Sequence, residues 1–352
     1  MTRIFAIAAG LILLAGAGAF YWYFGPKPEL TVTTWEGAYG RAQQTAQMAP
    51  YQASHRVNLR IAVWDGDLKN LKGDVVDFEL PKAAEACQRG LLEKIDAAQL
   101  PAGDDGTPAE KDFLPGAIGP CWVGNNVYSQ VIVSSKFPGA QPTTLADFFD
   151  TEKFPGRRAL KRGSAKYNME MALLAVGVAP KDIYPTLSGT VGILRALGKL
   201  SGLGDNLTWY HSDAEGLELI QSGGACFTTA LNGAVFESLS HDGNQNVIWD
   251  HQLYEFDAFG IPAGNARKDL AMDFIRFATG AKPLAGVAQW QPFGPARRSG
   301  LALVGENPAT HKAMRDFLPT AHFDTAFAVD ETWWRDHGAN AQAAWAQWQA
   351  AH

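Results

Sequence analysis

Aromatic residues stand beside carboxylates at the ends of several predicted strands. The pairs are Trp35-Glu36, Trp64-Asp65, Phe78-Glu79 and the run Tyr254-Glu255-Phe256-Asp257, with Tyr39 shortly after the first of them. Ligands of open α/β sheets bind at the carboxyl ends of strands, and an aromatic face beside a carboxylate attracts a cation. Taken singly, each pair is better explained by a core aromatic residue beside a solvated acid. The prediction of a cation-binding cleft therefore depends on the recurrence of this aromatic–carboxylate pairing at four places in the chain.

The three cysteines allow either a disulfide or chemistry. Cys87 and Cys121 flank a proline-rich segment, and in an oxidising compartment a disulfide between them would close that loop. The alternatives are three buried thiols, or a nucleophilic Cys121. Because no histidine or carboxylate is identifiable as the activator of Cys121, the disulfide is the stronger interpretation, with Cys226 left unpaired.

Signatures of enzymes and metal sites are scarce. The chain has no GxSxG, HExxH or P-loop motif and no GxGxxG after a strand, and its histidines lack the spacing of metal ligands. No catalytic residue, cofactor or metal is predicted. The basic run at 157–162, with Lys166, is interpreted as a solvated rim; docking of an acidic partner or of an anionic ligand group is the alternative.

Length and charge restrict the class of protein further. A chain of 352 residues, 47% of them apolar, predicts about two compact units. The formal net charge of −6 offers no surface that neutralises phosphates, so nucleic acid is not an expected partner. We expect a monomer.

The N-terminal segment 1–24 is typical of an export signal. Arg3 precedes an uncharged apolar run, and the small residues at 15–19 offer peptidase sites after Ala17 or Ala19. The run is also long enough to remain as a membrane anchor, flanked by Tyr21 and Trp22. In both cases we expect the body of the chain to be periplasmic.

Strands and helices alternate along the body, which predicts an α/β fold with helices on both faces of a parallel or mixed sheet. The strands are expected at 30–35, 57–64, 74–78, 127–134, 207–210 and 226–231, with short β segments at 247–249 and 256–261. Helices are expected at 41–52, 81–89, 144–150, 167–178, 186–200, 212–223 and 267–279. The chain is predicted to cross between two units near Gln130 and again near Tyr254.

An ordered series of motifs covers this body: TTWEGAYG, DVVDFE, GLLEKID, TTLADFFDTEKFPGRRAL, NMEMALLAVGV, LNGAVF, FDAFGIPAGNARKDLAMDFIRFATG, WQPFGPARRSGLAL and DETWWRDH. The series resembles the extracellular solute-binding proteins of ABC importers, and within them the spermidine/putrescine-binding branch. The resemblance implies a two-lobed periplasmic-binding-protein fold of type II, with a ligand cleft between lobes that close about a hinge. By this analogy one lobe holds 29–129 plus 254–300, and the other holds 130–253 plus 301–352.

The resemblance also implies a function and a site. The protein would capture a small solute and deliver it to an ABC permease, without catalysing a reaction. Cleft positions of the family match Trp35, Glu36, Phe78, Glu79 and Asp257, and the predicted ligand-binding set adds Tyr39, Tyr167, Asn232 and Glu255.

Several positions depart from the polyamine-binding pattern. Glu255 and Leu231 replace two tryptophans, while Ser164 and Tyr167 replace acidic residues. The prediction is therefore a cationic or amine-bearing solute; if Arg162 and Lys166 point into the cleft, a zwitterion fits better than a polyamine.

Two other hypotheses remain at this point. One is an enzyme on the same scaffold, in which Cys121 attacks a heteroaromatic cation such as thiamine. The other is a membrane-anchored sensor or assembly factor that keeps segment 1–24.

Overall fold

The structure is a computed structural model that describes residues 26–241 and 245–352. The predicted export signal at 1–24, on which the anchored-sensor hypothesis depends, lies outside these residues. Within them, no helix combines the length and apolar character needed to cross a membrane.

All ten strands of the described residues belong to one mixed sheet. They are β1 Glu29–Thr34, β2 Asn58–Val63, β3 Val75–Glu79, β4 Val123–Ser135, β5 Arg158–Lys161, β6 Leu207–Tyr210, β7 Phe227–Leu231, β8 Gln245–Gly260, β9 Gly294–Pro295 and β10 Phe327–Ala328. The order is β2-β1-β3-β8-β4-β7-β5-β6, and β9 and β10 pair with β4 and β8. The outer strands run parallel to their neighbours, whereas β4 and β8 are antiparallel to each other at the centre.

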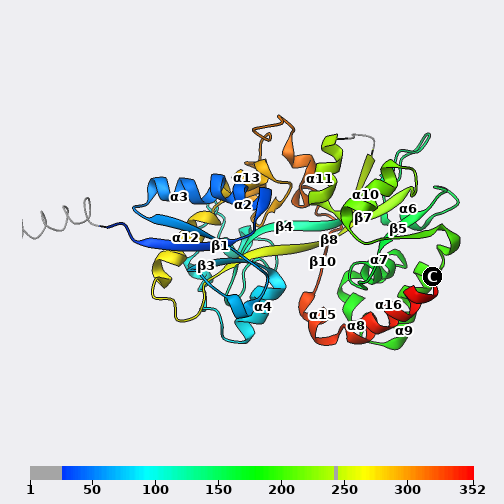
Figure 1. The fold of residues 1–352 in the computed structure, drawn as a ribbon, viewed down its shortest axis with the longest axis horizontal. Helices are drawn as coiled ribbons and strands as arrows, with labels where there is room; N and C mark the ends of the chain where they lie inside the picture. The colour runs from blue at the N-terminus through cyan, green and yellow to red at the C-terminus, as the bar shows by residue number, and fades with distance from the viewer. Residues whose placement is uncertain (1–25, 242–244) are drawn as a thin grey trace, which may run out of the picture.

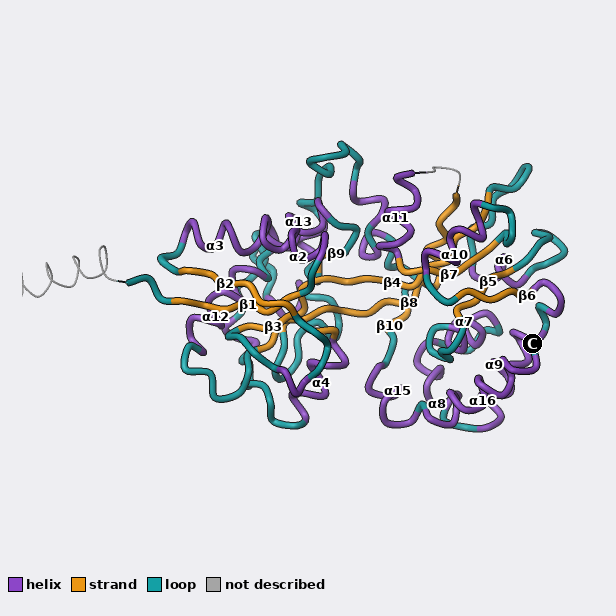
Figure 2. The backbone as a smooth tube through the Cα atoms, viewed as in Figure 1, coloured by secondary structure: helices purple, strands orange, loops and turns teal. Residues whose placement is uncertain are grey.

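Helices cover the sheet at both ends (Figure 2). The α-helices are α2 Gly37–Gln43, α3 Ala49–Ser54, α4 Leu80–Gln88, α5 Ala109–Asp112, α6 Leu145–Phe149, α7 Asn168–Ala175, α8 Ile183–Leu187, α9 Thr190–Ser201, α10 Asp213–Gln221, α11 Asn232–His241, α12 Lys268–Ala278, α13 Ala281–Trp290, α14 Arg298–Leu301, α15 Glu331–His337 and α16 Ala339–Ala351. A π-helical turn, Gln44–Met48, joins α2 to α3, and short 3-10 turns occur at Leu68–Asn70, Ala97–Gln99, Pro180–Asp182, Gly204–Asn206, Met314–Phe317 and Pro319–Ala321.

The sheet supports two lobes that are joined by β4 and β8 (Figure 1). One large hydrophobic core contains Val32, Phe259 and Phe274, and the other contains Phe148 and Trp345, all of them fully buried. The two-lobed α/β fold predicted from the sequence is thus confirmed.

β8 corrects the prediction of two separate β segments at 247–249 and 256–261. It is a single strand of 16 residues, because it pairs with β4 along most of its length. The register shifts between Gln130 and Ile132, and the extra residues on β8 include His251, whose φ of 54° lies in the left-handed region. This bulge interrupted the alternation of side chains that sequence reasoning uses to recognise a strand.

The basic run at 157–162 is a solvated rim only in part, because Arg157 and Arg162 are exposed but Arg158 is not. It contains β5, and Arg158 is fully buried. The Arg158 guanidinium donates to the carbonyl oxygens of Phe148 at 2.8 Å, Asp150 at 2.8 Å and Gly156 at 2.5 Å. These hydrogen bonds all go to backbone carbonyls, and the guanidinium lies 4.8 Å from the centre of the Phe227 ring. Arg158 thus ties the loop between α6 and β5 to the sheet and does not face an anionic partner.

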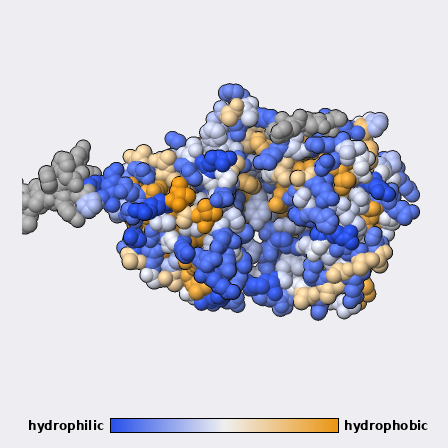
Figure 3. All heavy atoms as spheres, viewed as in Figure 1, coloured by the Kyte–Doolittle hydropathy of each residue, from blue (hydrophilic) through white to orange (hydrophobic). Residues whose placement is uncertain are grey.

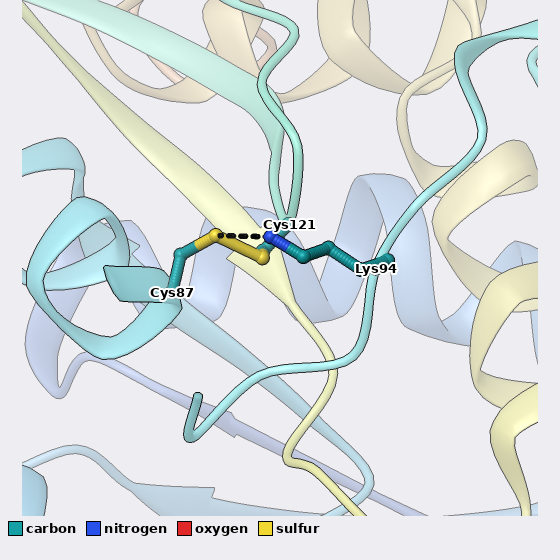
Figure 4. Close-up of a disulfide and its surroundings, with 3 residues drawn as sticks. All are labelled: Cys87, Lys94 and Cys121. Atoms are coloured by element: carbon teal, nitrogen blue, oxygen red, sulfur yellow. Dashed lines mark hydrogen bonds between the residues drawn. A yellow bond between two sulfur atoms is a disulfide. The ribbon is translucent and has the colours of Figure 1, made fainter. Parts of the chain in front are cut away.

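A disulfide joins Cys87 of α4 to Cys121, with their Cα atoms 5.7 Å apart, as predicted (Figure 4). The ammonium of Lys94 lies 3.8 Å from the Cys87 sulfur. Since Cys121 carries no thiol, the hypothesis of an enzyme with Cys121 as nucleophile is wrong. Cys226 is a free cysteine.

We expect the Cys87→Ala/Cys121→Ala variant to unfold with a free energy about 3–4 kcal/mol lower than the wild type, because the bond closes a loop across 34 positions. Urea unfolding followed by circular dichroism measures the difference. Cys226→Ala serves as the control for loss of a thiol. Equal unfolding midpoints for the double variant and the oxidised wild type would show that the disulfide does not restrain the unfolded chain.

Candidate functional site

Three carboxylates meet where β3 and β8 pair. Glu79 lies opposite Asp257 in the antiparallel register, and residues in that position have Cβ atoms about 4.5–5.5 Å apart. Asp77 stands two residues before Glu79 and points to the same face of β3. Asn126 of β4 lies opposite Asp257 on its other side. We call Asp77, Glu79 and Asp257 the carboxylate cluster.

The cluster borders a cavity of about 480 Å³ between the lobes. Figure 3 shows the surface recessed between the two lobes. The cavity is lined by Trp35, Tyr39, Glu79, Tyr128, Asp213, Leu231, Gly233, Ala234, Glu237, Asp257, Gln291 and Phe293. Four of these residues are acidic and none is lysine or arginine. Asp213 is paired with Lys161 at 3.0 Å, so Glu79 and Asp257 are the acids that favour a positively charged group.

Burial makes the cluster electrostatically strained. Asp77 is fully buried and accepts hydrogen bonds from the Tyr39 hydroxyl at 2.7 Å and from the Gln43 amide at 2.8 Å. Burial nevertheless raises the pKa of Asp77 to about 7. Burial and the neighbouring Asp77 raise the pKa of Asp257 well above its ordinary value. A cation placed beside these groups would stabilise their ionised forms.

Several buried polar atoms at the cluster have no hydrogen-bond partner among the described residues. They are Asp77 Oδ1, Glu79 Oε2, Asn126 Oδ1 and Trp35 Nε1. Buried polar groups are nearly always paired, and an unpaired one costs about 1–3 kcal/mol. Of these residues, Glu79 and Trp35 line the cavity and can offer one acceptor and one donor to a ligand, whereas Asp77 and Asn126 lie behind its lining.

Glu255 belongs to a second set of contacts. Its carboxylate accepts from Lys166 Nζ at 3.1 Å, from the Tyr128 hydroxyl at 3.3 Å and from the Tyr167 hydroxyl. Lys166 also pairs with Glu331 at the start of α15. This set adjoins a cavity of about 640 Å³ between the lobes, on the side where α4 and α15 lie close together.

The structure brings together four of the predicted ligand-binding residues: Trp35, Tyr39, Glu79 and Asp257 all line the smaller cavity. Glu36 does not, because it is the exposed residue that precedes α2. Phe78 is fully buried, with its ring 5.2 Å from that of Trp64. Side chains alternate along a strand, so Phe78 must point away from the face that carries Asp77 and Glu79.

The remaining predicted residues hold the two lobes together around the cavity. Asn232 accepts from the Ser129 backbone N–H at 2.9 Å and donates to the Pro292 carbonyl at 2.5 Å. Tyr167 and Glu255 contact each other and Lys166. Of the two bases considered, Lys166 points inward, whereas the Arg162 guanidinium lies 5.7 Å from the centre of the Trp209 ring.

Sequence reasoning missed Asp77, Asn126, Tyr128 and Phe293. The period-two alternation of β3 would have found Asp77, since it shares a face with Glu79. Phe293 contacts Tyr39 edge to face, with ring centres 5.2 Å apart, and it comes from a loop that no pattern placed at the cavity. Among the described residues, no group of His, Cys, Asp and Glu is arranged to hold a metal ion.

Comparisons with known proteins identify the family of the chain. The family of bacterial extracellular solute-binding proteins matches residues 65–315. A gamma-aminobutyric acid-binding protein from Pseudomonas aeruginosa is 31% identical over 91% of this chain and 91% of its own.

Solved structures show the same fold. A receptor for γ-aminobutyric acid (GABA) has 29% identity and a TM-score of 0.71, over 92% of this chain and 98% of its own. A spermidine/putrescine-binding protein of Streptococcus pneumoniae shares the fold alone, with a TM-score of 0.71 at 12% identity over 92% of this chain and 99% of its own. The resemblance predicted from the motifs is confirmed, and the chain belongs to the bacterial extracellular solute-binding proteins.

Proposed function

We propose that this protein captures a small amine-bearing solute in the cavity of about 480 Å³ and delivers it to an ABC permease. One observation carries the proposal: Glu79 and Asp257 face each other across β3 and β8 in a cavity whose lining contains no lysine or arginine. Asp257 is buried and Glu79 is half-buried, so two ionised carboxylates repel each other there without a counter-cation, and an ammonium ion relieves that repulsion.

The surroundings of the carboxylates suit an ammonium group. An ammonium has three N–H donors, and the carboxylates of Glu79 and Asp257 line the cavity, with Glu79 Oε2 without a partner among the described residues. Trp35, Tyr39 and Phe293 line the same cavity and offer aromatic faces and edges around the cation. Charge-assisted hydrogen bonds to the carboxylates would supply most of the affinity.

An amino acid fits this cavity better than a polyamine does. The two relatives named for GABA are the more similar in sequence, and GABA carries a single ammonium. Trp35 Nε1 is a buried donor without a partner and would serve the carboxylate of such a solute. At position 231, where polyamine binders place a tryptophan, the cavity has Leu231. We therefore favour an ω-amino acid of the 4-aminobutanoate type.

Capture would proceed by closure of the lobes. The two hydrophobic cores support a division into 29–129 plus 254–300 and 130–253 plus 301–352, with β4 and β8 as the hinge. A solute that contacts both lobes shifts the population toward the closed state. Capture would take place outside the cytoplasmic membrane, by a protein that acts as a monomer and catalyses no reaction.

We expect Asp257→Asn to weaken 4-aminobutanoate binding by about 10- to 100-fold, since a hydrogen bond to a charged group contributes about 1.5–3 kcal/mol. Isothermal titration calorimetry measures the change. Asp250→Asn is the matched control, because Asp250 lies on the same strand but accepts from the Leu145 backbone N–H at 2.9 Å, away from the cavity. Unchanged affinity in Asp257→Asn would mean that this carboxylate does not hold the ammonium.

Binding should also depend on pH. Because the pKa of Asp77 is raised to about 7, the unliganded cluster binds protons below that pH, and a cation must displace them. Affinity for 4-aminobutanoate is therefore expected to rise between pH 5.5 and pH 7.5. In the same window the unliganded protein loses stability as pH rises, since its folded state holds protons that the unfolded chain has released.

Calorimetry in two buffers of different ionisation enthalpy measures the protons released at pH 6. Asp77→Asn should lower this release, and Asp257, whose pKa is also raised, should account for the rest. A release of zero in the wild type would contradict the assignment of protonated carboxylates to the empty cavity.

A further inference from the structure

Lys166 is an ammonium group built into the space between the lobes. It extends from the loop before α7 to Glu255 on β8 at 3.1 Å and to Glu331 on α15. Its Nζ also lies 4.6 Å from the centre of the Tyr167 ring. The side chain is thus fixed by two carboxylates and one aromatic face, which are the same kinds of group that we assign to the solute ammonium.

Glu255 and Asp257 form two neighbouring carboxylate positions. They are two residues apart on β8 and therefore on one face, about 6.5–7 Å apart along the strand. Tyr128, opposite Glu255 on β4, lines the smaller cavity and donates to Glu255 at 3.3 Å, so the two positions adjoin. A diaminoalkane of four or five carbons has its two ammonium groups at about this separation.

The two positions differ in what occupies them. Glu255 has three donors: Lys166, Tyr167 and Tyr128. Among the described residues, the Asn126 amide donates a hydrogen bond to Asp257 at 3.1 Å and no cation pairs with it, while Glu79 faces it across the sheet. Only the Asp257 position is thus open to a cation from solution.

We propose that Lys166 acts as an internal counter-cation which occupies the place of a second ammonium and restricts the cleft to solutes that carry one. This inference rests on the proposed function and names Lys166 as the residue that determines specificity. A diamine bound at Asp257 would bring its second ammonium against that of Lys166, and like charges at such a distance repel.

Lys166 is poorly placed to bind the anionic end of a solute. It already faces Glu255 and Glu331, so an anion beside it would meet two carboxylates. Burial alone favours the neutral amine, but these two acids hold the pKa of Lys166 above its ordinary value and keep it charged. We therefore assign to Lys166 the exclusion of the second ammonium group of a diamine.

The test is calorimetry with two probes, 4-aminobutanoate and 1,4-diaminobutane, on wild type and Lys166→Met. The wild type should bind 4-aminobutanoate at least 100-fold more tightly than the diamine. In Lys166→Met, affinity for the diamine should rise at least tenfold while affinity for 4-aminobutanoate changes less than threefold. Lys153→Met is the control, because Lys153 pairs with Asp147 at 2.9 Å outside both cavities.

If Lys166→Met does not fold, the double variant Lys166→Met/Glu331→Gln replaces it, because it also removes the Glu331 carboxylate that has lost its partner. We expect the same changes in affinity for the two probes. A folded variant whose preference between the probes equals that of the wild type overturns the inference, and so does a wild type that binds the diamine as tightly as 4-aminobutanoate. In both cases the proposed function stands. Failure of the wild type to bind either probe or butylamine refutes the proposed function, and the inference falls with it.

Discussion

The antiparallel pairing of β4 with β8 is the constraint on which the rest of the molecule depends. These two long strands are central to the sheet and pass from one lobe into the other, so each lobe folds against one end of the same ladder. The pairing also fixes the chemistry, because it sets Asn126 beside Asp257 and Tyr128 beside Glu255. A hinge and a binding surface thus arise from the same backbone hydrogen bonds.

The carboxylates on this binding surface fall into two parts: Glu255 in one, and Asp77, Glu79 and Asp257 in the other. Burial raises the pKa of Asp77 and of Asp257, and among the described residues the chain supplies a cation only to the part that contains Glu255. Lys166 stabilises Glu255, while Asp77, Glu79 and Asp257 meet amide and hydroxyl donors alone among the described residues. We infer that the unliganded protein retains protons at the second part and that a bound solute replaces them. Affinity and stability would then respond to pH in opposite directions.

Much of the fold was predictable from local pattern. The strand that ends at Trp35, the disulfide and the two-lobed organisation follow from alternation, spacing and motif order. Glu79 was recognised because it ends a strand, and Asp257 because the family resemblance placed it in the cleft. What failed depended on contacts distant in sequence: Phe78 is core because Trp64 packs on it, and Arg158 is buried because three carbonyl oxygens of a neighbouring loop surround it. The continuity of β8 was hidden by a bulge that only its partner strand reveals.

A crystal structure of the protein with 4-aminobutanoate would locate the ammonium nitrogen. We expect this nitrogen within about 3.2 Å of a carboxylate oxygen of Asp257 or Glu79, with Lys166 still paired to Glu255. An ammonium held elsewhere, or a Lys166 that has left Glu255 to bind the solute carboxylate, would contradict this expectation.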